Sequence, residues 1–126
     1  MKDHISLIQH LDLQYLIDRM VNKYSWEPVA AKETVRKYKN FLTLKYVYPD
    51  LEFAPRREID EIWHQHILFT KNYMRDCELI FGKYIHHTPS LGTAEERRTL
   101  DKRFVESARI YEDYFQEPYG YTIGLL

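Results

Sequence analysis

The chain has little cysteine: Cys77 is the single one among 126 residues. One cysteine cannot form an internal disulfide, so the disulfide scaffolds of small secreted proteins are excluded and a reducing compartment is favoured. No apolar window approaches the roughly 18 residues of a membrane span. The N-terminal segment MKDHISLIQHLDLQYLID carries acids and histidines where a signal peptide needs an unbroken apolar run. We therefore expect a cytoplasmic protein with no membrane partner.

An excess of charge of either sign is also missing. The 18 basic and 19 acidic residues are mixed along the chain and leave a formal net charge of -1. Proteins that bind a phosphate backbone carry a basic field, so we expect no nucleic-acid partner. The four glycines are scattered, which excludes a glycine-rich phosphate loop, and no GxSxG nucleophile elbow occurs. No motif therefore identifies a catalytic residue or an organic cofactor.

The sequence does have enough apolar surface for a folded core. Hydrophobic residues make up 44% of the chain and charged residues 29%, which are the proportions of an ordinary globular protein. Apolar residues recur at intervals of three and four, and no run alternates with the period of a strand. The pattern predicts an all-α fold: a compact single domain over residues 1–126, with four main helices and a short loop that carries a histidine pair.

Turn and capping residues divide the chain into the four predicted helices. Their approximate bounds are 11–24, 25–46, 55–81 and 94–117. Ser25 is the expected N-cap of the second helix, and Gly82 is the residue that ends the third. The loop YPDLEFAP separates the second helix from the third, and the capping box TAEE precedes the fourth. An apolar segment, TIGLL, closes the sequence.

The third predicted helix and the residues after it concentrate the polar chemistry. The stretch EIDEIWHQHILFTKNYMRDCELIFGKYIHH holds four of the six histidines and the cysteine. At about 100° per residue, one stripe of the helix is apolar, aromatic or small apart from His66, and should face the core. It comprises Ile59, Ile62, Trp63, His66, Thr70, Tyr73, Cys77, Ile80 and Phe81. We interpret His66 as a core histidine bonded to a backbone group or to Tyr73, and Cys77 as a small buried hydrophobe.

Asp60 and His64 lie four residues apart on an adjoining face. At that spacing both can hold one ion, or the carboxylate can orient the imidazole. His64 and His66 point about 200° from each other, so the H-x-H pair is not expected to bind one metal. His86 and His87 lie in HHTPSLG, which cannot continue a helix and could fold back. We predict a divalent metal site of Asp60, His64 and His87, for Fe or Zn, with Mn possible on this ligand set.

The residues around this set are predicted to line a pocket or to add ligands. They are Trp63, His66, Tyr73, Cys77 and His86. In the alternative interpretation, Asp60 and His64 form an ordinary helical hydrogen bond and the polar set is an internal network of a non-catalytic interaction or scaffold module. The partner would then be an unknown small molecule or protein. The sequence leaves open both the oligomeric state and whether the protein is an enzyme.

The same stretch resembles the signature of the glycine-rich domain-containing protein-like family, D-x-x-W-H-x-H followed by a tyrosine, D-C, a glycine and a histidine. The matching positions are Asp60, Trp63, His64, His66, Tyr73, Asp76, Cys77, Gly82 and His87. The resemblance extends to YKNFLTLKYVYPD upstream and IYEDYF downstream. It implies that Asp60, His64, His66, Cys77 and His87 form one set. Members with a glycine-rich region, which this chain lacks, are linked to stress responses and RNA, and the resemblance implies no activity.

Overall fold

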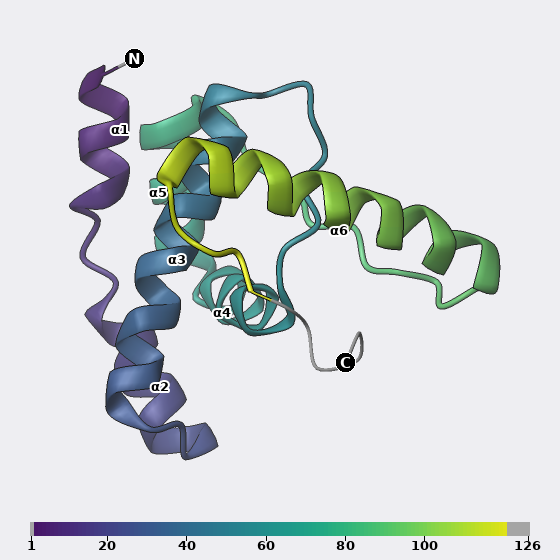
Figure 1. The fold of residues 1–126 in the computed structure, drawn as a ribbon. Coiled ribbons are helices and arrows are strands. Elements are labelled where there is room, and N and C mark those ends of the chain that lie inside the picture. The colour runs from purple at the N-terminus through teal and green to yellow at the C-terminus, as the bar shows by residue number, and fades with distance from the viewer. Residues whose placement is uncertain (1, 121–126) are drawn as a thin grey trace.

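The structure is a computed structural model that describes residues 2–120 (Figure 1). In that range the chain forms six α-helices and no strand, so the all-helical prediction is confirmed and the predicted number of four main helices is too low. The helices are α1 (Lys2–Gln9), α2 (Gln14–Tyr24), α3 (Pro28–Val47), α4 (Arg57–Leu68), α5 (Thr70–Phe81) and α6 (Ala94–Phe115). No helix among the described residues is both long and apolar enough to cross a membrane.

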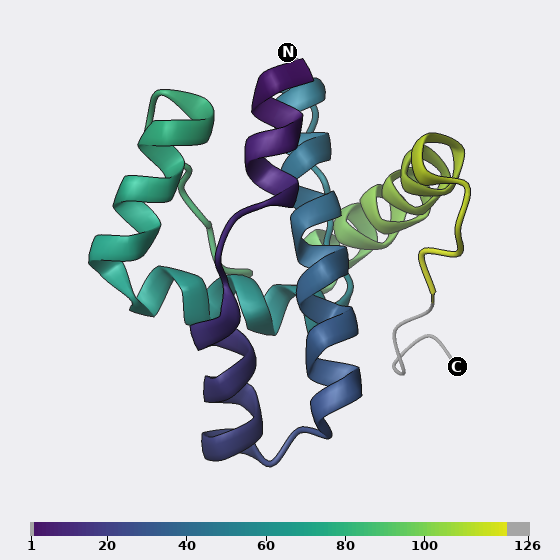
Figure 2. The same ribbon diagram turned by 90° about the vertical axis from the view of Figure 1, so that its left-hand side faces the viewer.

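Helix α3 lies at the centre of the fold. It contacts α1, α2, α4 and α6, and Figure 2 shows α1 and α2 one after the other along its length. Five consecutive residues near its C-terminal end, Asn40 to Leu44, are all buried. This part of α3 is therefore enclosed by its neighbours, whereas the first turns of the helix are exposed on one side.

The turn between α2 and α3 differs from the prediction at Ser25. This residue is not the N-cap of α3 but ends α2 in the left-handed conformation, with φ 59°. The chain must reverse direction within three residues, and a left-handed residue followed by a bond from Trp26 N–H to the Met20 carbonyl (3.0 Å) achieves this. Glu27 caps α3 instead, since its carboxylate accepts from Ala30 N–H, and Pro28 occupies the first turn as predicted.

The predicted third helix is two helices, α4 and α5, divided at Phe69. Phe69 has φ -81° and ψ 70°, and Figure 2 shows the chain turning sharply between α4 and α5. Its ring packs edge-on against Tyr15 of α2 at 4.9 Å and lies 5.7 Å from the Arg19 guanidinium. We attribute the break to this contact, since no proline or glycine marks the position. As predicted, Gly82 ends α5, with φ 70°.

The two ends of the described chain also differ from the prediction. Helix α1 was not predicted, and it is tied to α3 because the Gln9 amide donates to Asn40 and Thr43. At the other end, Thr93 caps α6 as predicted by accepting from Glu96 N–H at 3.1 Å. The capping box is not reciprocal, however, since the Glu96 carboxylate accepts from the N–H groups at 91 and 92. The apolar segment TIGLL lies outside the described residues.

Candidate metal centre

The structure brings Asp60, His64 and His87 together. Asp60 Oδ1 lies 2.8 Å from His87 Nε2, and Asp60 Oδ2 lies 3.3 Å from His64 Nε2. The two Nε2 atoms are 2.9 Å apart. Asp60 and His64 come from successive turns of α4, and His87 comes from the segment that follows α5, which Figure 2 shows running back to α4. Among the described residues this is a group of three side chains whose possible ligand atoms all lie within 4.8 Å of one another.

The distances within this cluster are those of ligand atoms around a shared positive charge. Two ring nitrogens and a carboxylate oxygen carry lone pairs, which repel at these separations unless a proton or a cation lies between them. Ligands about 2.0–2.1 Å from one ion, at angles of about 90–110°, stand about 2.9–3.4 Å apart. The 2.9 Å between the two Nε2 atoms and the 2.8 Å from Asp60 Oδ1 to His87 Nε2 lie close to this range. The side chain of His64 is 52% exposed and that of His87 16% exposed, so the cluster is open to solvent on one side.

The position of His87 is set by contacts with α4 and α5. The Trp63 indole stacks on the His87 ring with centroids 4.1 Å apart. The same indole donates its N–H to the Tyr73 hydroxyl at 3.0 Å, and that hydroxyl donates in turn to the Ile85 carbonyl. The face of the Trp63 indole therefore contacts the His87 ring, and its N–H, through the Tyr73 hydroxyl, supports the backbone at Ile85, two residues before His87. This is the kind of outer support that fixes the orientation of a histidine ligand.

His66 belongs to a separate buried network. Its Nδ1 lies 2.7 Å from the Tyr38 hydroxyl and its Nε2 lies 2.9 Å from Asp76 Oδ2. Burial keeps the pKa of Tyr38 well above its usual value, so the hydroxyl is protonated and can donate to Nδ1, which leaves Nε2–H to donate to Asp76. The expected partner Tyr73 contacts the ring only edge-on, at 4.9 Å. Our assignment of partners for His66 was therefore wrong, although its placement in the core is confirmed.

Cys77 and His86 lie outside the cluster of three. Cys77 is buried on α5, and burial raises the pKa of its thiol. A protonated thiol in the core is neither a nucleophile nor a ready ligand. His86 is exposed and packs against the Tyr84 ring at 4.9 Å. Both histidines line the cleft described next, but only His87 contacts Asp60 and His64 of α4.

A cleft of about 690 Å³ opens beside the cluster. It is bounded by the loop before α4, by the segment after α5 and by α6, and Asp60, His87 and Trp63 form part of its wall. Lys45 of α3 also lines it. The Lys45 ammonium lies 5.2 Å from the Trp63 ring and 5.4 Å from the Phe41 ring. Sequence reasoning missed Lys45, because only the packing of α3 against α4 brings it to Trp63.

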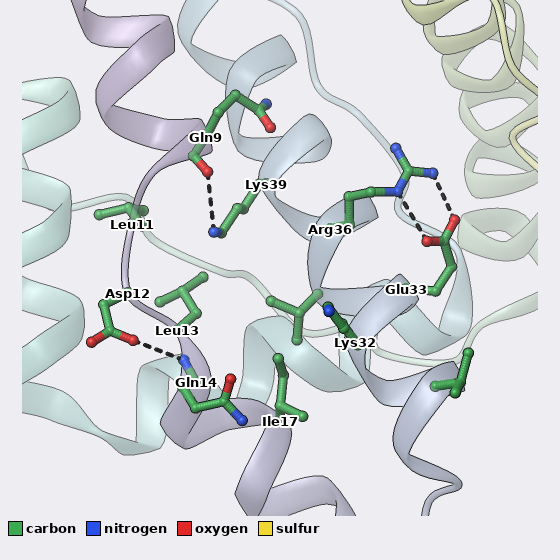
Figure 3. Close-up of a pocket in the computed structure, with 12 residues that line it drawn as sticks. Gln9, Leu11, Asp12, Leu13, Gln14, Ile17, Lys32, Glu33, Arg36 and Lys39 are labelled. Atoms are coloured by element: carbon green, nitrogen blue, oxygen red, sulfur yellow. Dashed lines mark hydrogen bonds and ion pairs between the residues drawn. The ribbon is translucent and has the colours of Figure 1, made fainter.

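A second hollow, of about 560 Å³, lies on the other side of α3 against the link between α1 and α2 (Figure 3). Its charged groups are mostly engaged. Lys39 donates to the Gln9 carbonyl, and Arg36 pairs with Glu33 and Glu117. It contains no cluster of metal-ligating side chains among the described residues. The cleft beside His87 is therefore the better candidate for a functional site.

Comparison with known proteins gives one match. A family model described as UCP032817-like matches residues 5–110, and no curated protein or solved structure matches the chain. This finding overturns the resemblance to the glycine-rich domain-containing protein-like family. Most positions of that signature are core residues here, such as Trp63, Tyr73 and Cys77, and core packing alone restricts them to a few residue types. The match covers most of the sequence, and the chain belongs to the uncharacterised UCP032817-like family.

Proposed function

We propose that this protein binds one divalent metal ion through Asp60, His64 and His87. The observation that carries the proposal is the convergence of three ligand atoms, from α4 and from the segment after α5, within 4.8 Å. Two imidazoles and one carboxylate suit Fe(II), Zn(II) or Mn(II). His87 lies 23 positions after His64 and 27 positions after Asp60. Helix geometry alone therefore does not account for the short distances from His87 Nε2 to His64 Nε2 and to Asp60 Oδ1.

Three protein ligands leave coordination positions free. A site with an open position can polarise a substrate oxygen or lower the pKa of a bound water, whereas a structural zinc site is closed by four protein ligands. The half-exposed His64 and the adjoining cleft give a small molecule access to such a position. The proposed role is therefore a metal centre that a small-molecule ligand can reach. The proposed compartment is the reducing cytoplasm, where the free thiol of Cys77 stays reduced.

The test is metal analysis of protein purified without a histidine tag. We expect about one equivalent of Fe, Zn or Mn in the wild-type protein and loss of the metal in the His64→Ala and His87→Ala variants. His86→Ala is the matched control. It removes the neighbouring imidazole from the same segment without touching the cluster, and should retain the metal.

The contrary result is equally specific. A wild-type protein that holds no metal, and whose melting temperature changes neither with added Zn(II) or Mn(II) nor with a chelator, would refute the metal centre. The fully bonded His66 network favours the second candidate in that case. The polar residues would then be internal hydrogen-bond partners in a non-catalytic interaction module.

A further inference from the structure

The cleft beside the cluster holds a lysine that has no carboxylate partner among the described residues. Lys45 carries its ammonium over the rings of Phe41 and Trp63, and no ion pair of the described chain includes it. Burial lowers the pKa of this ammonium, and Glu52 opposes that shift only from a distance. The protein therefore keeps a poorly solvated cation at the wall of a cleft, where an anion would stabilise it.

The other lysine and arginine side chains around the cleft have carboxylate partners, and the carboxylates of Asp60, Glu96 and Asp101 also belong to its wall. Glu52 pairs with Arg103 at 2.8 Å, and Arg57 lies 3.7 Å from Glu61. The Glu96 carboxylate accepts hydrogen bonds from Ser90 and from the backbone after it. Of the lysine and arginine side chains that line the cleft, Lys45 is therefore the one that no ion pair among the described residues includes.

Aromatic side chains form another part of the wall. Phe53 of the loop before α4 and Phe104 of α6 are buried and line the cleft together with the Trp63 indole. A cleft of about 690 Å³ is large enough for a small organic molecule, since ligand pockets run from about 300 to 1,000 Å³. Trp63 lies between the cluster of metal-ligating side chains and Lys45, because its indole stacks on the His87 ring and also contacts the Lys45 ammonium.

We propose that the cleft binds a small organic acid, with its carboxylate on the Lys45 ammonium and its apolar or aromatic body along Trp63, Phe53 and Phe104. The inference rests on the proposed function in one respect: it takes the cleft as the route by which a ligand reaches the metal centre. The carboxylate supplies the counter-charge that Lys45 lacks, and the aromatic wall supplies the contact area.

The experiment compares two ligands of the same shape by isothermal titration calorimetry. Benzoate carries a carboxylate and benzamide carries a neutral amide on the same ring. We expect benzoate to bind the wild-type protein about tenfold more tightly than benzamide. Lys45→Met keeps the aliphatic stem on the rings of Phe41 and Trp63 and should abolish the preference, whereas Lys45→Arg should keep it. Lys32→Met is the matched control, because Lys32 is exposed in the other hollow and should leave both affinities unchanged.

The proposal is overturned if benzoate and benzamide bind equally, if neither binds at millimolar concentration, or if Lys45→Met retains the preference. The wild-type comparison needs no variant, so it stands even if Lys45→Met does not fold. Running each titration on metal-free and Zn(II)-loaded protein separates this inference from the metal centre. We expect tighter benzoate binding in the loaded wild type and no such gain in His64→Ala. Failure of the protein to take up Zn(II) would refute the metal centre, and the metal-free titration would still decide the role of Lys45.

Discussion

His64 and His66 are two residues apart on α4 and have opposite surroundings. His66 is buried, and each of its ring nitrogens has a hydrogen-bond partner from another helix. His64 is about half exposed, and its Nε2 faces both the Nε2 of His87 and the carboxylate of Asp60. A buried histidine with a hydrogen-bond partner on each ring nitrogen has a structural role. A histidine whose ring nitrogen faces another imidazole and a carboxylate is arranged to share a proton or a cation with them. The same helix therefore carries a core network on one face and a candidate site on another.

The largest expected effect comes from breaking the core network. His66→Ala removes a ring that holds a buried carboxylate, Asp76, and a buried hydroxyl, Tyr38. The variant leaves the Tyr38 hydroxyl and Asp76 Oδ2 without this partner and opens a cavity, while Arg75 Nε remains 3.2 Å from Asp76 Oδ1, so the free energy of unfolding should fall by about 3–5 kcal/mol in urea titrations. His64→Ala is the matched control and, in chelator, should change the free energy of unfolding by no more than about 0.5 kcal/mol. Equal losses in the two variants would contradict the assignment of structural and ligand roles.

The difference between the two histidines follows from helical periodicity, which is why the sequence predicts it. A residue step of about 100° sends positions 64 and 66 to nearly opposite faces whatever the rest of the fold does. The partners of His66 were not predictable in the same way. Tyr38 lies 28 positions away on α3, and only the packing of α3 against α4 brings it to the ring.

Other features of the fold also depend on contacts between distant segments. The break at Phe69 has no proline or glycine to announce it, and follows from a ring contact with Tyr15 on another helix. The cleft needs α3, α6 and the two segments that flank the α4–α5 pair, so neither Lys45 nor Phe104 could be assigned to it from local spacing. Gly82 and Thr93 were predicted correctly because their roles depend on the neighbouring few residues alone.

A smaller effect is expected at Tyr73, whose hydroxyl connects the two regions. Tyr73→Phe removes the acceptor for the Trp63 N–H and the donor to the Ile85 carbonyl. The loss of these buried hydrogen bonds should lower the free energy of unfolding by about 1–3 kcal/mol. Because the segment that carries His87 is held less firmly, Zn(II) affinity should fall about tenfold, as it does when outer partners of metal ligands are removed. Calorimetric titration with Zn(II) measures the second effect, and an unchanged affinity would show that stacking on Trp63 is enough to place His87.

The smallest expected effect is a change in the reactivity of Cys77, which reports on the segment that carries His87. The thiol is buried beside Tyr73 and the Ile85 backbone, and burial raises its pKa above the value of a free cysteine. At a given pH the folded protein therefore holds less thiolate than the unfolded chain. Alkylation by iodoacetamide should be slow at pH 7–8 and should rise only at a pH above that at which the urea-unfolded protein reacts.

The same shift has a defined sign for stability. The unfolded chain loses the thiol proton first, so ionisation of Cys77 favours unfolding as the pH rises through and above the free-thiol pKa, and has no effect below it. Tyr73→Phe should speed alkylation at pH 8, because the segment over the thiol opens more often, and Zn(II) should slow it in the wild-type protein but not in His87→Ala. If Zn(II) slows alkylation equally in both proteins, the ion does not act through His87. If the native thiol reacts at pH 7 as fast as in urea, the segment from 84 to 87 does not cover Cys77 in solution, and the support for His87 from α5 is lost.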